Sequence, residues 1–464
     1  MKIPSLVVFS ALALVGPLFA QAPPGEGPAM GGNRMHQSDV VGGNYTLDEL
    51  RAHGQMIFST PFNKLDGYGD GPINPLDTTS PGGRPTLQGN GTFLRVNGLD
   101  AQTCIECHSV GSNAIAPFRF GIGGVGGSNS NAIGGPRNID VDDEVGAGFA
   151  SFDGRYINPP FLFGSGGVEL AGKEMTQDLQ RAKHLAASMP DVSVPLITHG
   201  VSFGSLTWST ALGGLDTSQV VGVSDDLVVR PFGRKGEFAT VRDFDVAAME
   251  FHLGMQPVEV VGHGNDGDGD GVVDEVFAGE LSVLHLFNVT LKAPVTDAPS
   301  PESLAGEALF QSIGCVECHV PTLETRKQLL PLTFPEVHNK PFNNGYMNVS
   351  LFGGNAGFQP NGVGGVSVPL FSDLKRHDMG PVLAESTGHA LAAQFVTARL
   401  WGVADTSPYM HDGRATTLTE AILLHGGEGQ TARNNFDVLS DTEKIAVLTF
   451  LRTLRTPLDP TGGL

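Results

Sequence analysis

The chain contains Cys104-Ile105-Glu106-Cys107-His108 and, further along, Cys315-Val316-Glu317-Cys318-His319, and these two stretches decide the fold. Each is a C-x-x-C-H motif, and together they use all four cysteines of the 464 residues. In this motif, which attaches c-type haem, both thiols lie on one side of a helical turn and can bond the haem, while the adjacent histidine can bind its iron. A redox pair of cysteines or half of a zinc site has a similar spacing. Because the motif occurs twice with no cysteine left over, we predict two covalently bound haem c groups, with His108 and His319 as the proximal iron ligands. The attaching residues are Cys104, Cys107, Cys315 and Cys318.

Helical patterns flank the second motif. Apolar residues spaced as in a helix run from Leu304 to Ile313 and lead into the motif. The capping box Ser440-x-x-Glu443 begins a closing helix that ends before Pro457. Residues 47–58 predict a comparable helix ahead of the first motif. The chain also holds 63 glycines and 31 prolines. We therefore predict a mainly α fold with long Gly/Pro-rich loops and two cytochrome c-like domains.

The first residues predict export. Lys2, the apolar run 6–19 and the small residue Ala20 form the pattern of a secretory signal peptide. We divide the chain into a signal peptide (1–20), a flexible N-terminal segment (21–44), a first haem domain (45–260), a linker (261–295), a second haem domain (296–457) and a tail (458–464). No other run reaches about 18 apolar residues, so no transmembrane segment is expected. The expected location is the bacterial periplasm or the exterior.

Charge excludes one class of partner and suggests another. The formal net charge is −21, whereas a protein that follows nucleic-acid phosphates needs a basic surface. We therefore expect no nucleic-acid partner. An acidic surface can attract a small basic electron donor, such as a cytochrome or a cupredoxin, although it can also serve solubility alone.

An acidic repeat lies in the predicted linker. Asp266, Asp268, Asp270, Val272 and Asp274 have the spacing of the first half of an EF-hand calcium loop, with glycine at its sixth position. The last position of such a loop is normally a glutamate, and here it is Phe277, so Glu275 or Glu280 would have to replace it. We predict a structural Ca²⁺ at these residues; the alternative is a solvated acidic linker.

Further stretches carry a family resemblance. The C-terminal run Leu400-Trp401-Gly402-Val403 is followed by Ser-Pro-Tyr-Met-His-Asp-Gly-Arg at residues 407–414. Matching stretches also occur at residues 158–164, 234–236, 254–255, 371–374 and 377–380. Together with the two C-x-x-C-H motifs, these resemble the di-haem oxidoreductase family, which is related to bacterial di-haem cytochrome c peroxidases and to MauG-type enzymes. The resemblance extends over most of the chain.

The resemblance implies a division of labour between two haems. One haem would store and pass an electron, and the other would meet hydrogen peroxide. The family usually places Met or Tyr as a distal ligand at the position of Gln394, which is not an iron ligand in such proteins. The second haem is then either open or bound by another residue. His377 is the leading candidate for that distal ligand, and a hydrogen-bonding role is its alternative. Met379, Met410 and His411 are the other candidates.

The resemblance also suggests residues for proton transfer. Related peroxidases place a glutamate over the reactive haem, and Glu174 and Glu169 lie in the comparable region of this chain. Either would act as a general acid and base toward peroxide; each could instead be an ordinary helix glutamate. Phe152 begins Phe-Asp-Gly-Arg where these peroxidases have Trp-Asp-Gly-Arg, so electron transfer through an aromatic relay at this position is in doubt. The sequence shows no evident distal ligand for the first haem. Peroxide binding requires such an open position on the iron.

We therefore predict an exported di-haem c-type oxidoreductase, an enzyme of the peroxidase type that reduces hydrogen peroxide. Two alternatives remain at this point. One is a di-haem electron-transfer cytochrome without turnover. The other is a di-haem oxygenase or protein-modifying oxidase.

Overall fold

The computed structural model describes residues 25–69, 158–354, 356–385 and 391–462, with short pieces at 94–95, 98–99, 103–106, 108, 138–139 and 150–151. The predicted signal peptide, Cys107 and the segment that begins at Phe152 lie outside these residues. Among the described residues, no helix is both long and apolar enough to cross a membrane.

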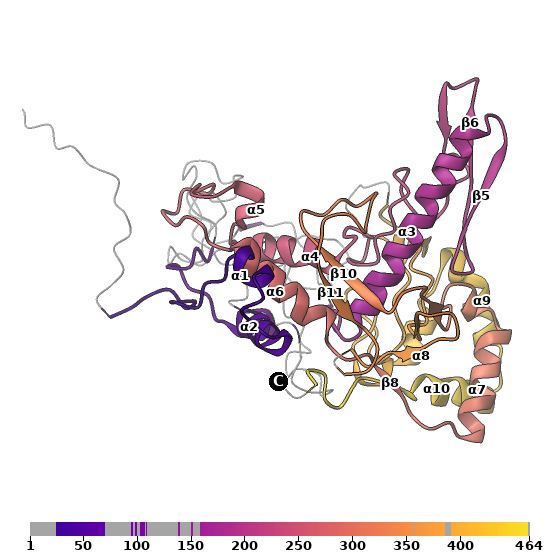
Figure 1. Ribbon diagram of the computed structural model, residues 1–464. Helices are drawn as coiled ribbons and strands as arrows, with labels where there is room; N and C mark the ends of the chain where they lie inside the picture. Colours follow the sequence, from indigo (N-terminus) through magenta and orange to yellow (C-terminus); the bar gives the residue numbers. More distant parts are fainter. Residues whose placement is uncertain are drawn as a thin grey trace, which may run out of the picture.

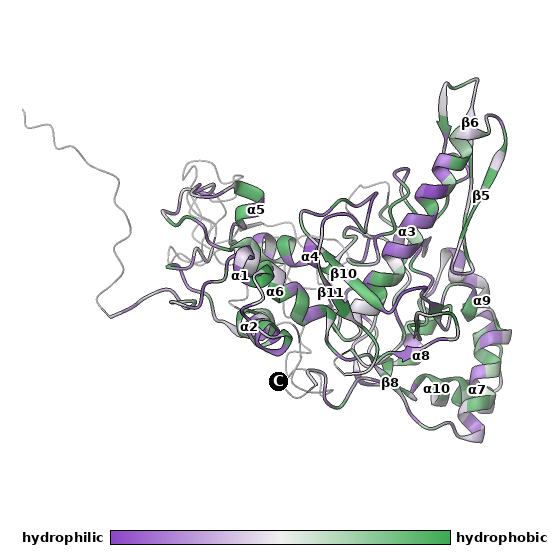
Figure 2. Cartoon of the chain, viewed as in Figure 1, coloured by the Kyte–Doolittle hydropathy of each residue, from purple (hydrophilic) through white to green (hydrophobic). Residues whose placement is uncertain are grey.

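Two helices cross closely in the N-terminal half. Helix α2 (Leu47–Ser59) begins at a capping box in which Thr46 and Glu49 bond each other's backbone N–H groups. It packs against α6 (Ala278–Val289), which is buried along nearly its whole length and hydrophobic in Figure 2. At the crossing, a Cβ added to Gly54 would lie 2.1 Å from the Val283 carbonyl oxygen. Only glycine therefore allows this approach.

The C-terminal half repeats this crossing. Helix α7 (Pro301–Ser312) packs against α10 (Asp441–Leu451), and the predicted capping box of Ser440 and Glu443 is confirmed. A Cβ added to Gly306 would lie 1.9 Å from the Ala446 carbonyl oxygen. In each half a phenylalanine follows the crossing glycine by four residues, namely Phe58 and Phe310. Two equivalent helix pairs thus form the two halves, and α6, inside the segment predicted as a linker, supplies the second helix of the first pair.

The prediction of a mainly α fold is wrong. About 34% of the structure is helical and 16% is strand. The strands are short and form separate antiparallel sheets in the connections between helices. In the strand Ser193–Thr198, exposed and buried residues alternate along the chain. This period of two residues is typical of a strand in a sheet with one covered face.

The longest helix, α3 (Ser165–Ser188), runs through the middle of the molecule (Figure 1). Its C-terminal end packs against the sheet β5-β6-β7, and it also contacts β10 and β13. The strands are β5 (Ser193–Thr198), β6 (Val201–Ser209), β7 (Gly214–Asp216), β9 (Leu323–Glu324), β10 (Leu329–Thr333), β11 (Gly345–Ser350), β12 (Gln359–Pro360) and β13 (Val366–Val368). β10 pairs with β11, and β13 lies between β12 and β9.

The remaining elements are short. The strands are β1 (Leu94–Arg95), β2 (Gly98–Leu99), β3 (Asn138–Ile139), β4 (Ala150–Ser151), β8 (Val295–Thr296), β14 (Arg376–Asp378), β15 (Gln394–Val396) and β16 (Leu454–Arg455). The helices are α1 (Gln37–Val41), α4 (Val241–Ala248), α5 (Val258–Val261), α8 (Leu418–Leu423) and α9 (Gln430–Asp437), with a π-turn at Met249–Leu253. Single 3₁₀ turns lie at Cys104–Glu106, Cys315–Glu317, Val403–Asp405 and Gly427–Gly429.

The end of the chain returns to the first half. The Thr461 carbonyl accepts a hydrogen bond from the guanidinium of Arg51, a buried residue of α2. The Nε of the same Arg51 donates to the Thr290 hydroxyl at 2.9 Å. The segment predicted as a tail is therefore packed, and it ties the C-terminal half to α2.

Candidate haem sites

Both C-x-x-C-H motifs form the same turn. The backbone N–H of His108 donates to the Cys104 carbonyl at 2.9 Å, and that of His319 donates to the Cys315 carbonyl at 2.9 Å. In each case a 3₁₀ turn begins at the first cysteine. The turn brings the histidine beside the crossing helix pair of its half: the Phe58 ring centroid lies 6.5 Å from that of His108, and the Phe310 centroid 6.3 Å from that of His319.

Each histidine is oriented by a backbone carbonyl. His108 Nδ1 lies 2.9 Å from the Pro160 oxygen, and His319 Nδ1 lies 3.0 Å from the Phe371 oxygen. A carbonyl can only accept, so Nδ1 carries the proton and Nε2 keeps its lone pair. This is the arrangement that metal-binding histidines adopt, because the second hydrogen bond fixes both tautomer and ring direction. The two stretches noted in the sequence, at residues 158–164 and 371–374, supply these carbonyls.

Burial keeps these side chains uncharged. It lowers the pKa of His108, and burial together with the neighbouring His425 lowers the pKa of His319 to about 4. Burial, with a contribution from Cys318, raises the pKa of the Cys315 thiol to about 12. The histidines are therefore neutral near pH 7, as iron binding requires.

The carbonyl at Phe371 depends on an unusual backbone. Phe371 has φ of 54° and Leu374 has φ of 58°, which is the left-handed region that non-glycine residues rarely adopt. Ser372 stabilises the turn: its hydroxyl donates to the Thr397 carbonyl and accepts from the Leu374 N–H. Such conformations persist where the surrounding structure fixes them, often at functional sites. Here the turn aims the Phe371 oxygen at His319.

A half-buried cation without a counter-ion among the described residues also fits a haem. Among the residues that the structure describes, Arg399 has no hydrogen-bond or ion-pair partner, and burial lowers its pKa to about 10. An arginine in this position needs an anion. The carboxylates of a haem propionate are of the right chemistry. Together with the oriented histidines and the adjacent thiols, this donor set fits covalent haem.

His377 does not have the geometry expected of a distal ligand. Its Nε2 donates to Asp373 Oδ2 at 2.8 Å, and its Nδ1 donates to Glu428 Oε2 at 2.7 Å. Burial alone would lower its pKa, but these carboxylates and a contact with the Cys318 sulfur raise it to about 11. Both ring nitrogens of His377 are thus bonded to carboxylates in this structure, which is the geometry of a hydrogen-bonding residue.

The other distal candidates also have partners nearby. His411 stacks on Phe395 with ring centroids 4.5 Å apart, and its Nε2 lies 3.8 Å from carboxylate oxygens of Glu385 and Asp412. The Met410 carbonyl accepts a hydrogen bond from Asn158. The Met379 methyl group lies near Gly429, in a loop that sequence reasoning did not single out. That loop contains His425, whose ring centroid lies 6.3 Å from that of His319.

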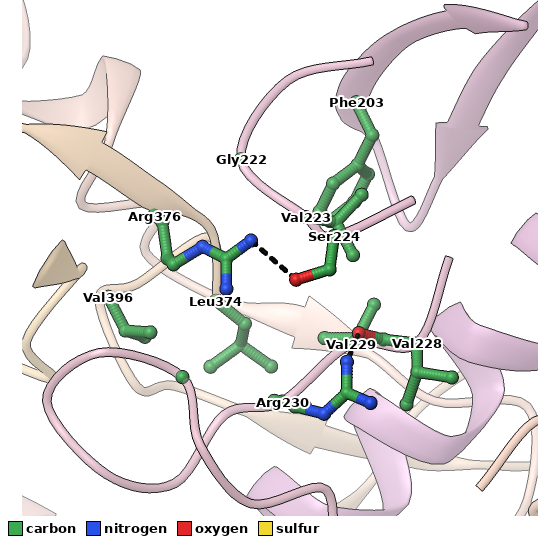
Figure 3. Close-up of a pocket in the computed structure, with 11 residues that line it drawn as sticks. Phe203, Gly222, Val223, Ser224, Val228, Val229, Arg230, Leu374, Arg376 and Val396 are labelled. Atoms are coloured by element: carbon green, nitrogen blue, oxygen red, sulfur yellow. Dashed lines mark hydrogen bonds between the residues drawn. The ribbon is translucent and has the colours of Figure 1, made fainter. Parts of the chain in front are cut away.

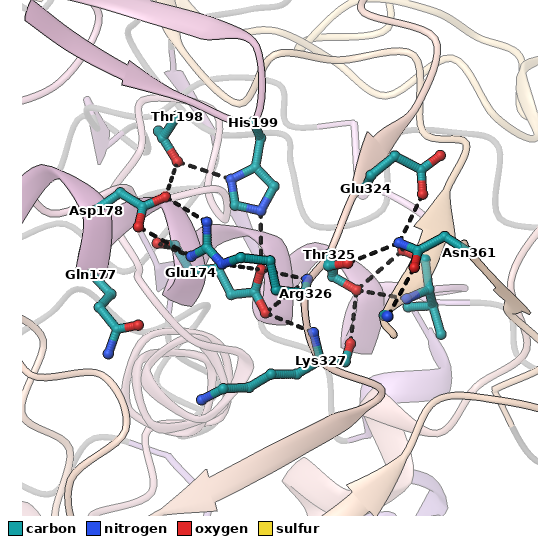
Figure 4. A network of polar contacts seen from close by, with 12 residues as sticks. Glu174, Gln177, Asp178, Thr198, His199, Glu324, Thr325, Arg326, Lys327 and Asn361 are labelled. Atoms are coloured by element: carbon teal, nitrogen blue, oxygen red, sulfur yellow. Dashed lines mark hydrogen bonds and ion pairs between the residues drawn. The ribbon is translucent and has the colours of Figure 1, made fainter. Parts of the chain in front are cut away.

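Glu174 lies in a polar network that joins α3 to the second half (Figure 4). Its carboxylate accepts hydrogen bonds from the backbone N–H groups of Arg326 and Lys327 at 2.9–3.1 Å and lies 3.1 Å from His199 Nε2. Its neighbour Asp178 pairs with the Arg326 guanidinium. Both oxygens of Glu174 are therefore occupied by groups that position the segment after the second motif.

Glu169 lies one turn earlier on α3, in a fully buried cluster. Its Oε1 is 2.9 Å from Lys173 Nζ, and its Oε2 accepts from His285 Nε2 and from the Val241 N–H, both at 2.9 Å. Burial raises the pKa of Glu169, but Lys173 and His285 outweigh it and hold the pKa well below its usual range. Glu169 is therefore an ionised acceptor. The Nδ1 of His285 has no partner among the described residues.

Three of the predicted calcium ligands converge. Carboxylate oxygens of Asp266, Asp268 and Asp270 lie within 4.8 Å of one another. Burial, with smaller contributions from these three aspartates, raises the pKa of Glu275 to about 9, and its Oε2 accepts a hydrogen bond from the Gln256 N–H at 2.7 Å. Asp274 instead accepts hydrogen bonds from Gly264 N–H at 2.8 Å and pairs with His263. Of the predicted ligands, Asp266, Asp268 and Asp270 are thus brought together, and the Asp274 carboxylate is bonded elsewhere.

The described part of the chain contains small pockets. One is lined by residues of β6, β14 and β15 and by the Val228–Arg230 segment, with Arg376 donating to Ser224 at 2.8 Å (Figure 3). It has room for about one water molecule. It is too small for an organic substrate, so we do not place the reaction there.

Comparison with known proteins bears on this arrangement. Residues 352–454 match the sequence model of the family described as "Di-haem oxidoreductase, putative peroxidase". The chain resembles the di-haem oxidoreductases. The matched segment holds the Phe371 carbonyl, the His377 cluster and α10, so the resemblance inferred from the sequence is confirmed on the residues that surround the second motif.

A curated relative and two solved structures extend the comparison. The cytochrome-c peroxidase IdrP2 of Pseudomonas sp. (strain SCT) is 30% identical over 176 residues, which is 36% of this chain and 44% of the relative. The chain thus matches less than half of that relative's length. The match to hydrazine synthase of Kuenenia stuttgartiensis covers 46% of this chain and 60% of the hydrazine synthase chain, with a TM-score of 0.26 and 15% identity. The match to a MauG-like protein associated with microbial copper homeostasis covers 48% of this chain and 68% of the MauG-like chain, with a TM-score of 0.27 and 17% identity.

Proposed function

We propose that this protein is an exported di-haem c-type oxidoreductase that reduces hydrogen peroxide. One observation carries the proposal: each half turns the histidine of its C-x-x-C-H motif onto a backbone carbonyl and leaves Nε2 for iron. The resemblance to di-haem oxidoreductases and the name of the peroxidase relative support it.

The chain's own residues would hold and tune the two groups. Cys104 and Cys107 attach the first haem and Cys315 and Cys318 the second, with His108 and His319 on the irons. When bound, haem supplies the redox-active iron at which peroxide is reduced. Hydrogen peroxide takes up two electrons and two protons and leaves as two water molecules. The protein must therefore accept two electrons from a small donor, for which its acidic surface suits a basic cytochrome or cupredoxin.

Glu169 and Glu174 both stay candidates for proton transfer, and in each the two carboxylate oxygens already have partners. What distinguishes Glu169 is its neighbour: its Oε2 lies 2.9 Å from His285 Nε2, and His285 Nδ1 has no partner among the described residues. Glu174 is held by two backbone N–H groups, which suits a positioning role.

Two further proposals concern location and metal content. Removal of residues 1–20 would leave the mature chain in the periplasm or outside the cell. A Ca²⁺ ion at Asp266, Asp268 and Asp270, with Glu275 as a further ligand, would neutralise the acidic group that precedes α6. Calcium would therefore stabilise the first helix pair and take no part in the reaction.

The test uses holoprotein purified from the periplasm of bacterial cells that attach haem to C-x-x-C-H motifs. Haem content should be two per chain, and replacing both cysteines of one motif by alanine should remove one haem. Peroxide should be consumed with a reduced donor present. A protein with two haems that leaves peroxide untouched in every redox state would instead be an electron-transfer cytochrome.

A further inference from the structure

We infer that His425 is the second axial ligand of the haem attached at Cys315 and Cys318. The second haem would then be bis-histidine ligated, and the first haem would be the one that reacts with peroxide. The inference rests on the proposed haem attachment, and it assigns a residue that the sequence did not indicate.

The spacing of two imidazole rings carries the argument. The ring centroids of His319 and His425 are 6.3 Å apart, with 58° between the ring planes. A metal binds an imidazole nitrogen at about 2 Å, and the ring centroid lies about 1 Å behind that nitrogen. Two imidazoles on opposite sides of one metal therefore have centroids about 6 Å apart. The angle between their planes is free, because each ring can rotate about the shared axis.

The hydrogen bonds leave the right nitrogens available. His425 Nδ1 donates to the Ala421 carbonyl at 2.9 Å, just as His319 Nδ1 donates to the Phe371 carbonyl. Within the described part of the chain, neither Nε2 has a hydrogen-bond partner. The fixed proton on Nδ1 places the lone pair on Nε2 in both rings. Two oriented imidazoles with ring centroids 6.3 Å apart thus each keep an Nε2 without a partner among the described residues.

The loop that carries His425 is fixed by contacts around the second motif. It follows α8, and at Gly427 (φ 51°) a Cβ would lie 2.1 Å from the Asp378 carbonyl oxygen, so the loop packs tightly on β14. Glu428 Oε1 accepts the Asp378 N–H at 2.9 Å, and its Oε2 accepts from His377. His377 in turn contacts the Cys318 sulfur at 3.8 Å. His377 is therefore a positioning residue that links the His425 loop to the attachment site.

Met379 is the rival ligand. It follows β14, and its methyl group lies near Gly429, beside the His425 ring. A thioether in place of an imidazole would give a histidine–methionine haem with a higher potential. The two possibilities differ in spectroscopy and can be separated without measuring activity.

The experiment records EPR and near-infrared magnetic circular dichroism of the oxidised holoprotein, wild type and His425→Ala, with Met379→Leu as the matched control. We expect a bis-histidine charge-transfer band in the wild type. His425→Ala should convert one of the two haems to high spin, added imidazole should restore the low-spin signal, and Met379→Leu should change neither spectrum. His377→Gln should broaden the low-spin signal without abolishing it.

Several results would overturn the inference. A histidine–methionine band in the wild type, or its loss in Met379→Leu, would make Met379 the ligand. An unchanged low-spin haem in His425→Ala would exclude His425. Should His425→Ala fail to accumulate, the wild-type band alone still decides between nitrogen and sulfur. Wild-type protein without covalent haem would instead refute the proposed function, so the two failures are distinguishable.

Discussion

The substitution Gly306→Ala tests whether the close helix crossing is what builds the second half. An added Cβ would lie 1.9 Å from the Ala446 carbonyl oxygen and 2.4 Å from its carbon. Ordinary contact begins near 3.4 Å, so α7 and α10 would have to separate by about 1.5 Å. Both contacts are backbone atoms, which no side-chain rotation can relieve.

The magnitude follows from two opposing effects. Overpacking of this kind costs about 3 kcal/mol, at the upper end of the usual range because the backbone must move. Alanine regains about 1 kcal/mol of helix propensity. We therefore expect a net loss of about 2 kcal/mol in the free energy of unfolding, together with weaker packing of Phe310 on Phe450, whose ring centroids are now 5.4 Å apart.

Denaturant unfolding followed by far-UV and Soret circular dichroism measures the effect. Gly54→Ala, which meets the Val283 carbonyl oxygen at 2.1 Å, should cost a similar amount in the first half. Gly214→Ala meets no atom within 4 Å and serves as the control, with a change within about 0.5 kcal/mol. If Gly306→Ala were as stable as Gly214→Ala, the close crossing would not exist and the equivalence of the two helix pairs would be refuted.

Two further predictions concern buried charge and metal. Glu169→Gln leaves the buried Lys173 ammonium without its counter-ion, so it should lower the free energy of unfolding by about 3–5 kcal/mol. The control Glu302→Gln, on the exposed side of α7, should change the free energy of unfolding by less than about 0.5 kcal/mol, and equal stabilities of the two variants in urea titrations would contradict the buried ion pair. Chelation with EDTA should lower the melting temperature of the wild type, and Asp270→Asn should abolish that shift. Asp274→Asn should retain most of the shift, because the Asp274 carboxylate is turned to Gly264 and His263. A melting temperature that does not change with EDTA would indicate a solvated acidic loop without bound calcium.

Local sequence patterns predicted the helices ahead of the two C-x-x-C-H motifs well. The C-x-x-C-H motif fixes the separation of thiols and imidazole within five residues, and the helix before each motif has its glycine and phenylalanine at the same spacing. The capping box at Ser440 likewise depends on neighbours three residues apart. Such features are determined by short-range geometry and can be recognised without the fold.

Patterns that depend on distant contacts were missed. The strands are two to nine residues long and lie in connections rich in glycine and proline, so their pairing is set by the surrounding packing rather than by propensity. His377 was expected at the iron because its own segment offered a strong ligand. Its partner Asp373 is four residues away, but Glu428 is 51 positions along the chain, and only the fold shows that both nitrogens are taken.

The same limit applied to His425. It follows a short helix and lies 106 positions after His319, so sequence spacing does not connect them. Two adjacent glycines after it, of which Gly427 has a positive φ, were a signal that the backbone there approaches another segment closely. Such a signal marks a tight loop, but it does not name the residue that the loop presents.

The central claim is that one haem is closed by two histidines and the other is open to peroxide. The most direct test delivers one electron per molecule to the holoprotein and records its EPR and absorption spectra before and after addition of peroxide. We predict one low-spin haem that persists and one high-spin haem whose signal is lost rapidly with peroxide. Two low-spin haems that ignore peroxide in every redox state would contradict the account and leave an electron carrier.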